Sequence, residues 1–124
     1  MTAIMNPDVD ERIKPLVLAL NRLPGVHTLG SCGGHVDPTP FQRPAHEWYV
    51  TCQIEDAQSL EIIAGLPSFC LGVSLLVFAD NPGFLTGSLT YELNGSAITA
   101  SKYRPAVECP EPNDVMTWLE VVPN

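Results

Sequence analysis

A hydroxyl, a thiol and an imidazole lie within five consecutive residues of this chain, around a pair of glycines. The segment reads Ser31-Cys32-Gly33-Gly34-His35. Cysteine and histidine are common nucleophiles, bases and metal ligands, and glycine adopts positive φ and lets backbone N–H groups approach a ligand closely. We therefore expect the functional site at this loop.

Ligand binding is the interpretation of the motif that we favour. Gly33 and Gly34 would offer backbone N–H groups to a small anionic ligand such as a carboxylate or a phosphate, and Ser31 and His35 would add side-chain hydrogen bonds. All five residues, Cys32 included, are then ligand-binding residues that form one wall of a polar pocket. The partner is a small molecule whose identity the sequence does not give.

Two other interpretations use the thiol. In the first, Cys32 and His35 bind a metal ion together with His27, His46 or Glu47. The C-x-x-H spacing supplies only two of the four ligands of a zinc site, and no second pair follows, so the sequence predicts no metal site and less than one zinc ion per chain. In the second, His35 or His46 activates the Cys32 thiol as a nucleophile.

A purely structural interpretation of the loop needs no chemistry. Gly33-Gly34 would be a tight turn, Ser31 would bond to its own backbone, and Cys32 would be a small buried hydrophobic residue. We expect burial also for Cys52 and Cys70, because both lie in predicted strands. The same core is expected to hold Trp48 and Trp118.

Charge and composition exclude several classes of protein. The 124 residues include 6 Lys and Arg against 14 Asp and Glu, a net charge of −8, so autonomous nucleic-acid binding is not expected. No apolar run approaches the roughly 20 residues that span a membrane, and residues 1–7 lack the basic start and apolar block of a signal peptide. We expect a cytoplasmic protein whose 4 cysteines form no disulfides.

The elements before the motif are expected to be a helix and a short strand. Apolar residues at helical spacing predict a helix that ends at Pro24-Gly25, and its apolar face consists of Ile13, Leu16, Val17, Leu20 and Leu23. Pro15 either kinks this helix or marks the point where it begins regularly. A strand over Val26 to Leu29 then leads into a loop from Gly30 to His46, and loops of that length are usually functional or disordered.

The elements after the motif follow from alternation and turn signals. We predict a strand over Glu47 to Ile54, then a helix capped by Asp56 and terminated by Gly65 and Pro67. A central strand from Phe69 to Phe78 would follow, with a helix on its small-residue side of Cys70, Gly72 and Ser74.

The last part of the chain predicts a hairpin and a short helix. A strand from Leu85 to Leu93 and a two-residue turn at Asn94-Gly95 would pair Tyr91 with Ile98. The end of the chain, through Val122, forms a helix capped by Asn113 or Asp114, or an edge strand. These elements make residues 1–124 a single α+β domain, with a mixed, mostly antiparallel sheet and two or three helices packed mainly on one side.

Short matching motifs give the chain a resemblance to known proteins. They are Ala19-Leu20-Asn21, Leu23-Pro24-Gly25-Val26, Thr28 and the segment Ser31 to His35. With them the chain resembles small uncharacterised bacterial and phage proteins that have an S-C-x-G-H motif after the first strand, a group with no assigned reaction. It is distantly similar, over about residues 12 to 54, to the tRNA methyltransferase of wybutosine synthesis, whose motif is S-C-S-G-R.

The distant resemblance implies an alternative function, a methyltransferase-like enzyme with S-adenosylmethionine as its cofactor. His35 stands where that family has arginine, and this chain is acidic where a tRNA enzyme is basic. A further alternative is a protein-interaction module, a homodimer joined through an exposed strand edge.

Overall fold

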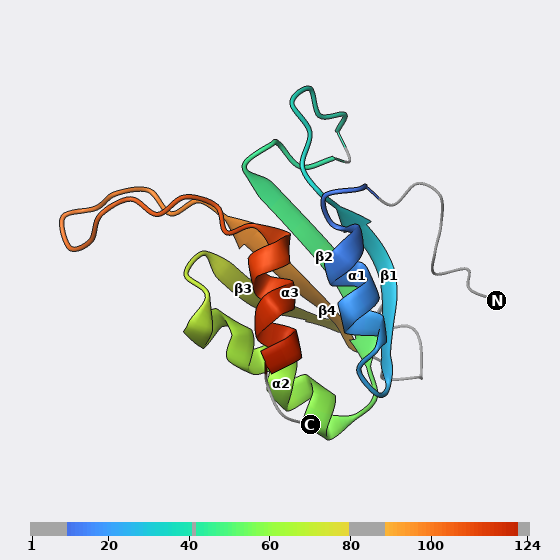
Figure 1. The fold of residues 1–124 in the computed structure, drawn as a ribbon. Coiled ribbons are helices and arrows are strands. Elements are labelled where there is room, and N and C mark those ends of the chain that lie inside the picture. The colour runs from blue at the N-terminus through green and yellow to red at the C-terminus, as the bar shows by residue number, and fades with distance from the viewer. Residues whose placement is uncertain (1–9, 41, 80–88, 122–124) are drawn as a thin grey trace.

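The computed structural model describes residues 10–40, 42–79 and 89–121, and this part of the chain forms three helices and one antiparallel sheet of four strands. The fold is α+β, as the sequence predicts. Figure 1 shows the elements, which in chain order are α1 (Lys14–Asn21), β1 (Val26–Cys32), β2 (Glu47–Ile54), α2 (Ala57–Phe69), β3 (Val73–Ala79), β4 (Leu89–Ser96) and α3 (Pro112–Val121).

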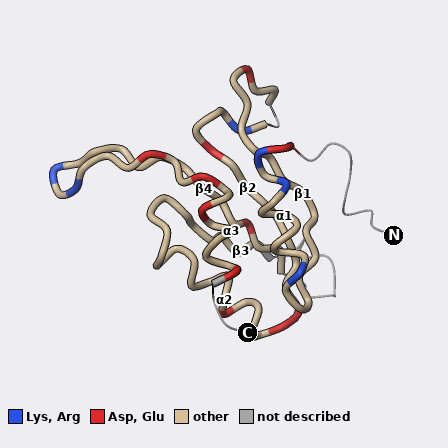
Figure 2. The backbone as a smooth tube through the Cα atoms, in the orientation of Figure 1, with Lys and Arg blue, Asp and Glu red and all other residues tan. Residues whose placement is uncertain are grey.

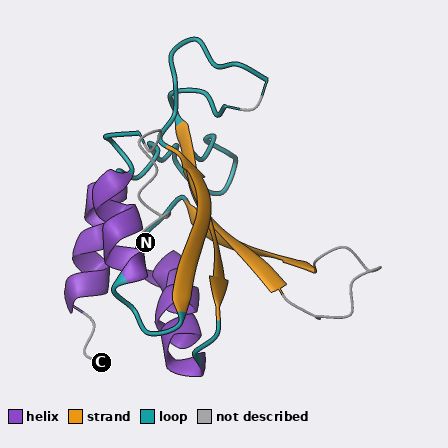
Figure 3. Cartoon of the chain, turned by 90° about the vertical axis from the view of Figure 1, so that its right-hand side faces the viewer, coloured by secondary structure: helices purple, strands orange, loops and turns teal. Residues whose placement is uncertain are grey.

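The sheet has the strand order β1-β2-β4-β3, so that β1 and β3 form its two edges. The helices lie on one face of the sheet (Figure 3). Strand β2 shows the resulting alternation, because Trp48, Val50 and Cys52 are fully buried under the helices while Tyr49 and Thr51 on the other face are partly exposed. We call this other face the open face. No helix in the described ranges is long and apolar enough to cross a membrane.

Two helix starts agree with the sequence analysis. Helix α1 has Pro15 in its first turn, where the missing N–H is not needed, so the proline marks the start of the helix and does not kink it. Asp56 caps α2 by accepting the Ser59 N–H at 2.9 Å.

The predicted end of α2 at Gly65 and Pro67 is wrong, because the helix continues through Pro67 to Phe69. Its buried face consists of Ser59, Ile63 and Leu66, which recur at helical spacing, and the Cys70 N–H closes the last turn on the Leu66 carbonyl at 2.9 Å. Burial of Leu66 offsets the one backbone hydrogen bond that the proline removes.

The predicted central strand is instead an edge strand. Strand β3 begins only at Val73, after a turn in which Gly72 has a φ of 89°. The helices cover the side of Val73, which is buried, and Ser74 on the opposite side is exposed, so the predicted helix on the small-residue side is also wrong. Cys70 and Cys52 are buried as expected.

The predicted turn at Asn94-Gly95 does not exist, because both residues lie inside β4. Gly95 pairs with Trp48, and a Cβ atom added at Gly95 would overlap the indole ring. The glycine is therefore needed for close packing against an indole and not for a turn. Tyr91 pairs with Cys52 and Val77, and the predicted strand positions before residue 89 lie outside the described residues.

Residues 97–109 form a long excursion that we call the arm. Two isolated bridges, Ile98 with Val107 and Ser101 with Arg104, hold its two sides together, and Figure 1 shows it reaching away from the sheet. Tyr103 near its tip is 87% exposed. The bridge to Val107 replaces the predicted pairing of Ile98 with Tyr91.

The arm returns to the core at Pro110 and continues as α3. The Trp48 indole N–H donates to the Pro110 carbonyl at 2.7 Å, and Val115 and Leu119 of α3 are buried. Trp118 was expected in the core, but it is 38% exposed and stacks on Phe69 with 5.0 Å between ring centroids. Of the two alternatives predicted for the end of the chain, the described residues form the helix. It begins at Pro112, so the predicted caps Asn113 and Asp114 lie inside its first turn, and Val122 lies outside the described residues.

Candidate functional site

The motif lies half in a strand and half in a loop. Strand β1 continues past its predicted end at Leu29 to Cys32, so the loop begins at Gly33 and not at Gly30. A register shift between Thr28 and Gly30 changes which side chains face the helices.

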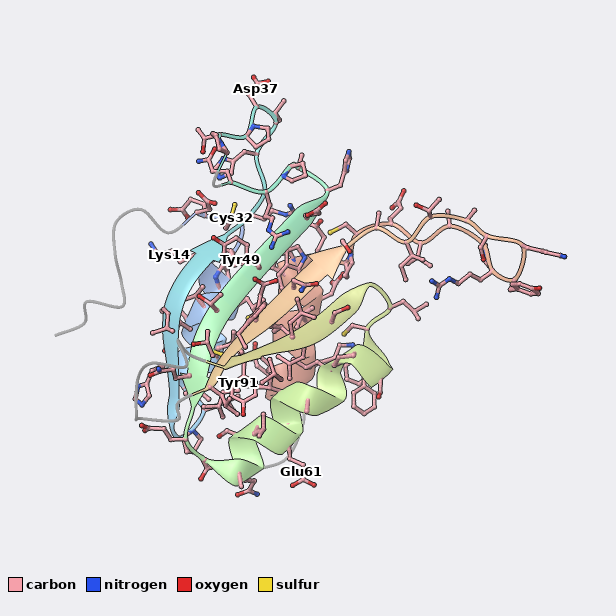
Figure 4. All side chains as sticks on the ribbon, turned by 180° about the vertical axis from the view of Figure 1, so that it is seen from behind. Lys14, Cys32, Asp37, Tyr49, Glu61 and Tyr91 are labelled. Carbon is pink, nitrogen blue, oxygen red and sulfur yellow. The ribbon has the colours of Figure 1, made fainter. Side chains whose placement is uncertain are left out.

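Because of that shift, Cys32 lies opposite Tyr49 on the open face. Figure 4 shows the two residues at the same end of the sheet, beneath the loop that carries Asp37. Burial, together with the neighbouring Cys32, raises the pKa of Tyr49. Ser31 precedes Cys32 in the same strand, so its side chain points to the opposite face and away from the thiol.

Three side chains that are common metal ligands converge at this end of β1. Donor atoms of Asp10, Cys32 and His35 all lie within 4.8 Å of one another. The Asp10 Oδ2 and His35 Nε2 atoms are 3.1 Å apart, and both side chains are 29% exposed. Cys32 is only 4% exposed, so the thiol forms the floor of the cluster and the carboxylate and imidazole form its mouth.

Backbone N–H groups hold two of these ligand atoms in place. The Gly33 N–H donates to Asp10 Oδ2 at 2.8 Å, and the Arg43 N–H donates to Cys32 Sγ at 3.3 Å. His35 is fixed through its own backbone, whose N–H donates to the Arg43 carbonyl at 2.9 Å. Such hydrogen bonds orient ligand side chains in metal sites.

Arg12 ties the segment before α1 to this loop. Its Nη1 atom donates to the Gly33 carbonyl at 2.6 Å and to the Ala45 carbonyl at 3.2 Å, and its Nη2 atom bonds to Glu111 at 2.7 Å. Although burial lowers it, the hydrogen bond and the charge of Glu111 leave the pKa of Arg12 above its ordinary value. The same side chain therefore fixes Asp10, two positions before it, next to the motif.

The glycine pair makes a turn that is packed against its own chain. Gly34 has a φ of 92°, and a Cβ atom there would lie 2.6 Å from the Glu47 carbonyl oxygen. The Gly33 N–H, which the sequence analysis offered to an anionic ligand, is donated to the Asp10 carboxylate. Substitution of Gly34 would therefore disturb the fold as well as any binding.

The other candidate donors lie apart from the cluster. His27 is exposed and pairs with Glu55 at 3.2 Å, Glu47 pairs with Arg43 at 3.3 Å, and His46 lies in an exposed turn. In the described part of the chain, Asp10, Cys32 and His35 are the group that comes together.

Asp10 is the functional candidate that the sequence analysis missed. It lies 23 residues before Gly33, in the segment that precedes α1. No fixed spacing connects an aspartate in one segment with a C-x-x-H pair in another, so only the folded chain identifies it as the third donor.

The same three groups are those of a thiol nucleophile with a base and an orienting carboxylate. In this structure the His35 Nε2 atom lies 3.1 Å from the Asp10 carboxylate, and the Cys32 sulfur accepts the Arg43 N–H. The imidazole–thiol hydrogen bond that would activate the nucleophile is not formed between these described residues.

A polar depression of about 560 Å³ lies beside the cluster on the open face. It is lined by residues of the loop and of strands β2 and β4, namely Pro40, Gln42, Arg43, Pro44, Glu47, Tyr49, Thr51 and Glu92. The Arg43 guanidinium lies 5.2 Å from the centre of the Tyr49 ring and 3.5 Å from the buried Glu92 carboxylate. Arg43 thus connects the depression with the Cys32 thiol, which its backbone contacts.

Comparisons with protein-family models, curated proteins and solved structures gave no match to this chain.

Proposed function

We propose that this protein binds a zinc-class metal ion through Asp10, Cys32 and His35, and that the ion binds a small anionic ligand at the Ser31 to His35 loop. The observation that supports this function is the convergence of a carboxylate, a thiol and an imidazole within 4.8 Å. The proposal keeps the small-ligand function expected from the sequence but assigns the attraction for an anion to a metal ion.

The donor set fits zinc or a similar transition metal. Thiolate and imidazole are preferred by such ions, and three protein ligands with one open position are typical of zinc sites that bind a further molecule. Ligand atoms of a tetrahedral zinc site lie roughly 3.3–3.5 Å apart, from bond lengths of about 2.0–2.3 Å. The Asp10 to His35 distance of 3.1 Å is close to that spacing, and the Cys32 sulfur lies within 4.8 Å of both atoms, so binding would draw the sulfur toward them.

The partial exposure of the cluster leaves room for the fourth ligand. Solvent reaches the Asp10 and His35 side chains, each 29% exposed, while Cys32 is buried behind them. A bound ion would compensate the negative charge of the carboxylate and thiolate, which otherwise repels an anion. The remaining position can then accept water, a carboxylate or a phosphate.

Titration with Co²⁺ and Zn²⁺ tests the metal site. We expect one ion per chain, with the thiolate-to-cobalt charge-transfer band and the d–d bands of a tetrahedral cobalt site. The variants Asp10→Asn, Cys32→Ser and His35→Gln should each weaken binding by at least about tenfold. The side-chain amide of Asp10→Asn still offers an oxygen to the Gly33 N–H, so this variant changes the metal ligand with little change in the fold.

His27→Gln is the matched control. His27 also pairs with a carboxylate, Glu55, at 3.2 Å, but it lies outside the donor cluster, so its replacement should leave metal binding unchanged. The proposal is wrong if the wild-type protein binds no stoichiometric ion, or if Asp10→Asn and His27→Gln bind it equally. Loss of the ion with retained folding would support the site.

The anion is tested separately on the cobalt-loaded protein. Addition of acetate or inorganic phosphate should shift the d–d bands, because the anion replaces water in the open position. Unchanged bands would contradict anion binding by the metal ion, but they would not contradict metal binding itself.

A further inference from the structure

Strand β3 lies at an edge of the sheet, although its sequence is typical of a buried strand. Val73–Ala79 reads Val-Ser-Leu-Leu-Val-Phe-Ala, without a charged residue or a proline. Its sole sheet neighbour among the described strands is β4. Leu76, Val77 and Phe78 are 45%, 55% and 47% exposed, so three consecutive large apolar side chains are accessible on both faces.

The opposite edge of the sheet shows how this chain protects an edge. In β1 the register shift next to Leu29 interrupts the ladder, and His27 forms a polar pair with Glu55. Bulges and charged side chains are the usual means of preventing edge-to-edge association. Strand β3 has neither: it pairs with β4 in unbroken register from Val73 to Ala79, and its outer edge is uncharged.

We propose that β3 pairs with β3 of a second copy of this chain, in antiparallel orientation around a two-fold axis at Leu76. Every second residue of an edge strand directs its N–H and C=O away from the sheet, so the occupant must be another strand. An antiparallel two-fold pairing places the same residues on both sides, and Leu76 is the middle residue of the seven.

Charge makes this edge a more favourable contact between two copies of the chain than other parts of the surface. Each chain has a net charge of −8, so two copies repel one another where acidic side chains meet. The uncharged β3 edge allows the copies to approach without opposing carboxylates along the strand. Pairing would join the two four-strand sheets into one continuous sheet and bury Leu76, Val77 and Phe78 of both chains.

Sedimentation velocity from about 1 to 200 μM tests this pairing. We expect the wild-type protein to change from a 13.5 kDa monomer to a species of twice that mass. Leu76→Lys should remain monomeric throughout, because it places two positive charges across the two-fold axis. The double variant Leu76→Lys, Phe78→Lys should behave in the same way, and circular dichroism should show that both variants are folded.

Leu29→Lys is the matched control on the other edge strand. Leu29 is 58% exposed in β1, so the variant adds the same charge to a similarly accessible edge leucine and should still dimerise. A wild-type protein that stays monomeric over the whole range would overturn the proposal. A dimer that persists in folded Leu76→Lys would overturn it too, because the contact would then not use the β3 edge.

Hydrogen exchange gives a second measurement. The β3 amides should become more protected as concentration rises, and the β1 amides should not. Dimerisation is independent of the proposed metal site, which lies at the opposite edge of the sheet, so Asp10→Asn should dimerise normally.

Discussion

Three of the four cysteines are held as neutral thiols. Burial raises the pKa of Cys52 from 9.0 to about 11. Burial, followed by the charge of Asp114, raises the pKa of Cys70, and burial raises that of Cys109 in spite of the nearby Arg12. Such thiols are poor nucleophiles and poor metal ligands at neutral pH. Cys32 is the cysteine that lies against an imidazole and a carboxylate, so thiol chemistry is expected there.

The buried thiol of Cys52 predicts a loss of stability at alkaline pH. Above pH 9 the thiol ionises in the unfolded chain, whereas in the folded protein it stays protonated up to about pH 11. The unfolded state then binds fewer protons than the folded state, so the free energy of unfolding falls as pH rises between these values. Urea denaturation from pH 7 to 11, in the presence of a reductant, measures this fall.

Cys52→Ala provides the comparison for that experiment. It lowers stability at pH 7, because it removes a buried side chain, but it also removes the titrating group. The difference in unfolding free energy between wild type and variant should therefore shrink as pH rises above 9. A constant difference across this range would show that Cys52 is not protonated preferentially in the folded state.

At the scale of single residues, the sequence identified Cys32 and His35 but not their arrangement. Their spacing marks them as possible ligands, and the structure places both in the donor cluster. Asp10 joins them because Arg12 and Gly33 hold the segment before α1 against the loop. Contacts of that kind depend on how distant segments pack, which no local spacing encodes.

At the scale of elements, the packing of Trp48 against Gly95 predicts a sensitive position in β4. A Cβ atom on Gly95 would overlap the indole ring, so Gly95→Ala must displace the Trp48 side chain and strain its hydrogen bond to Pro110. We expect a loss of about 1–3 kcal/mol in unfolding free energy, as for other overpacked cores. Urea denaturation followed by tryptophan fluorescence measures the loss.

Gly30→Ala is the control, because Gly30 also lies in a strand paired with β2. A Cβ atom there would meet Thr51 Oγ1 at 3.4 Å, an ordinary contact. This variant should stay within about 0.5 kcal/mol of the wild type. Equal stability of both alanine variants would show that the ring of Trp48 moves aside at little cost.

The elements were predicted well where a local pattern and the tertiary packing agree. Strand β2 has its predicted bounds, and Asp56 caps α2 as expected. The predicted hairpin was wrong, although Asn94-Gly95 is a strong local turn signal. Gly95 is instead required in the strand, where it leaves room for the Trp48 indole. The apolar sequence of β3 predicted a central strand, but the order of strands depends on how distant segments pair, and local apolarity does not encode it.

At the scale of the whole molecule, the few basic residues are placed where they hold segments together. The Arg12 side chain donates to Gly33 in the loop after β1, and Arg43, within that loop, donates its backbone N–H to Cys32 of β1. Figure 2 shows a separate group of positive charge at the tip of the arm, where the turn joins Ser101 to Arg104.

The arm makes the chain divisible at one peptide bond. Trypsin cleaves after lysine and arginine unless proline follows, and proline follows Lys14, Arg43 and Arg104. The bonds after Arg12 and Arg22 are protected by the fold. The Arg12 side chain donates to carbonyl groups of the loop, and Arg22 lies at the end of α1, next to the buried Leu23. The exposed bond after Lys102 remains.

Brief treatment of the folded protein with trypsin should therefore give two fragments, residues 1–102 and 103–124. They should elute together from a sizing column, because α3 stays attached through Val115, Leu119 and the Trp48 bond to Pro110. Early cleavage elsewhere, or separation of the fragments without denaturant, would contradict this arrangement. If the pair holds, the protein can be assembled from two separately made polypeptides, and the shorter one could be synthesised chemically with labels in α3.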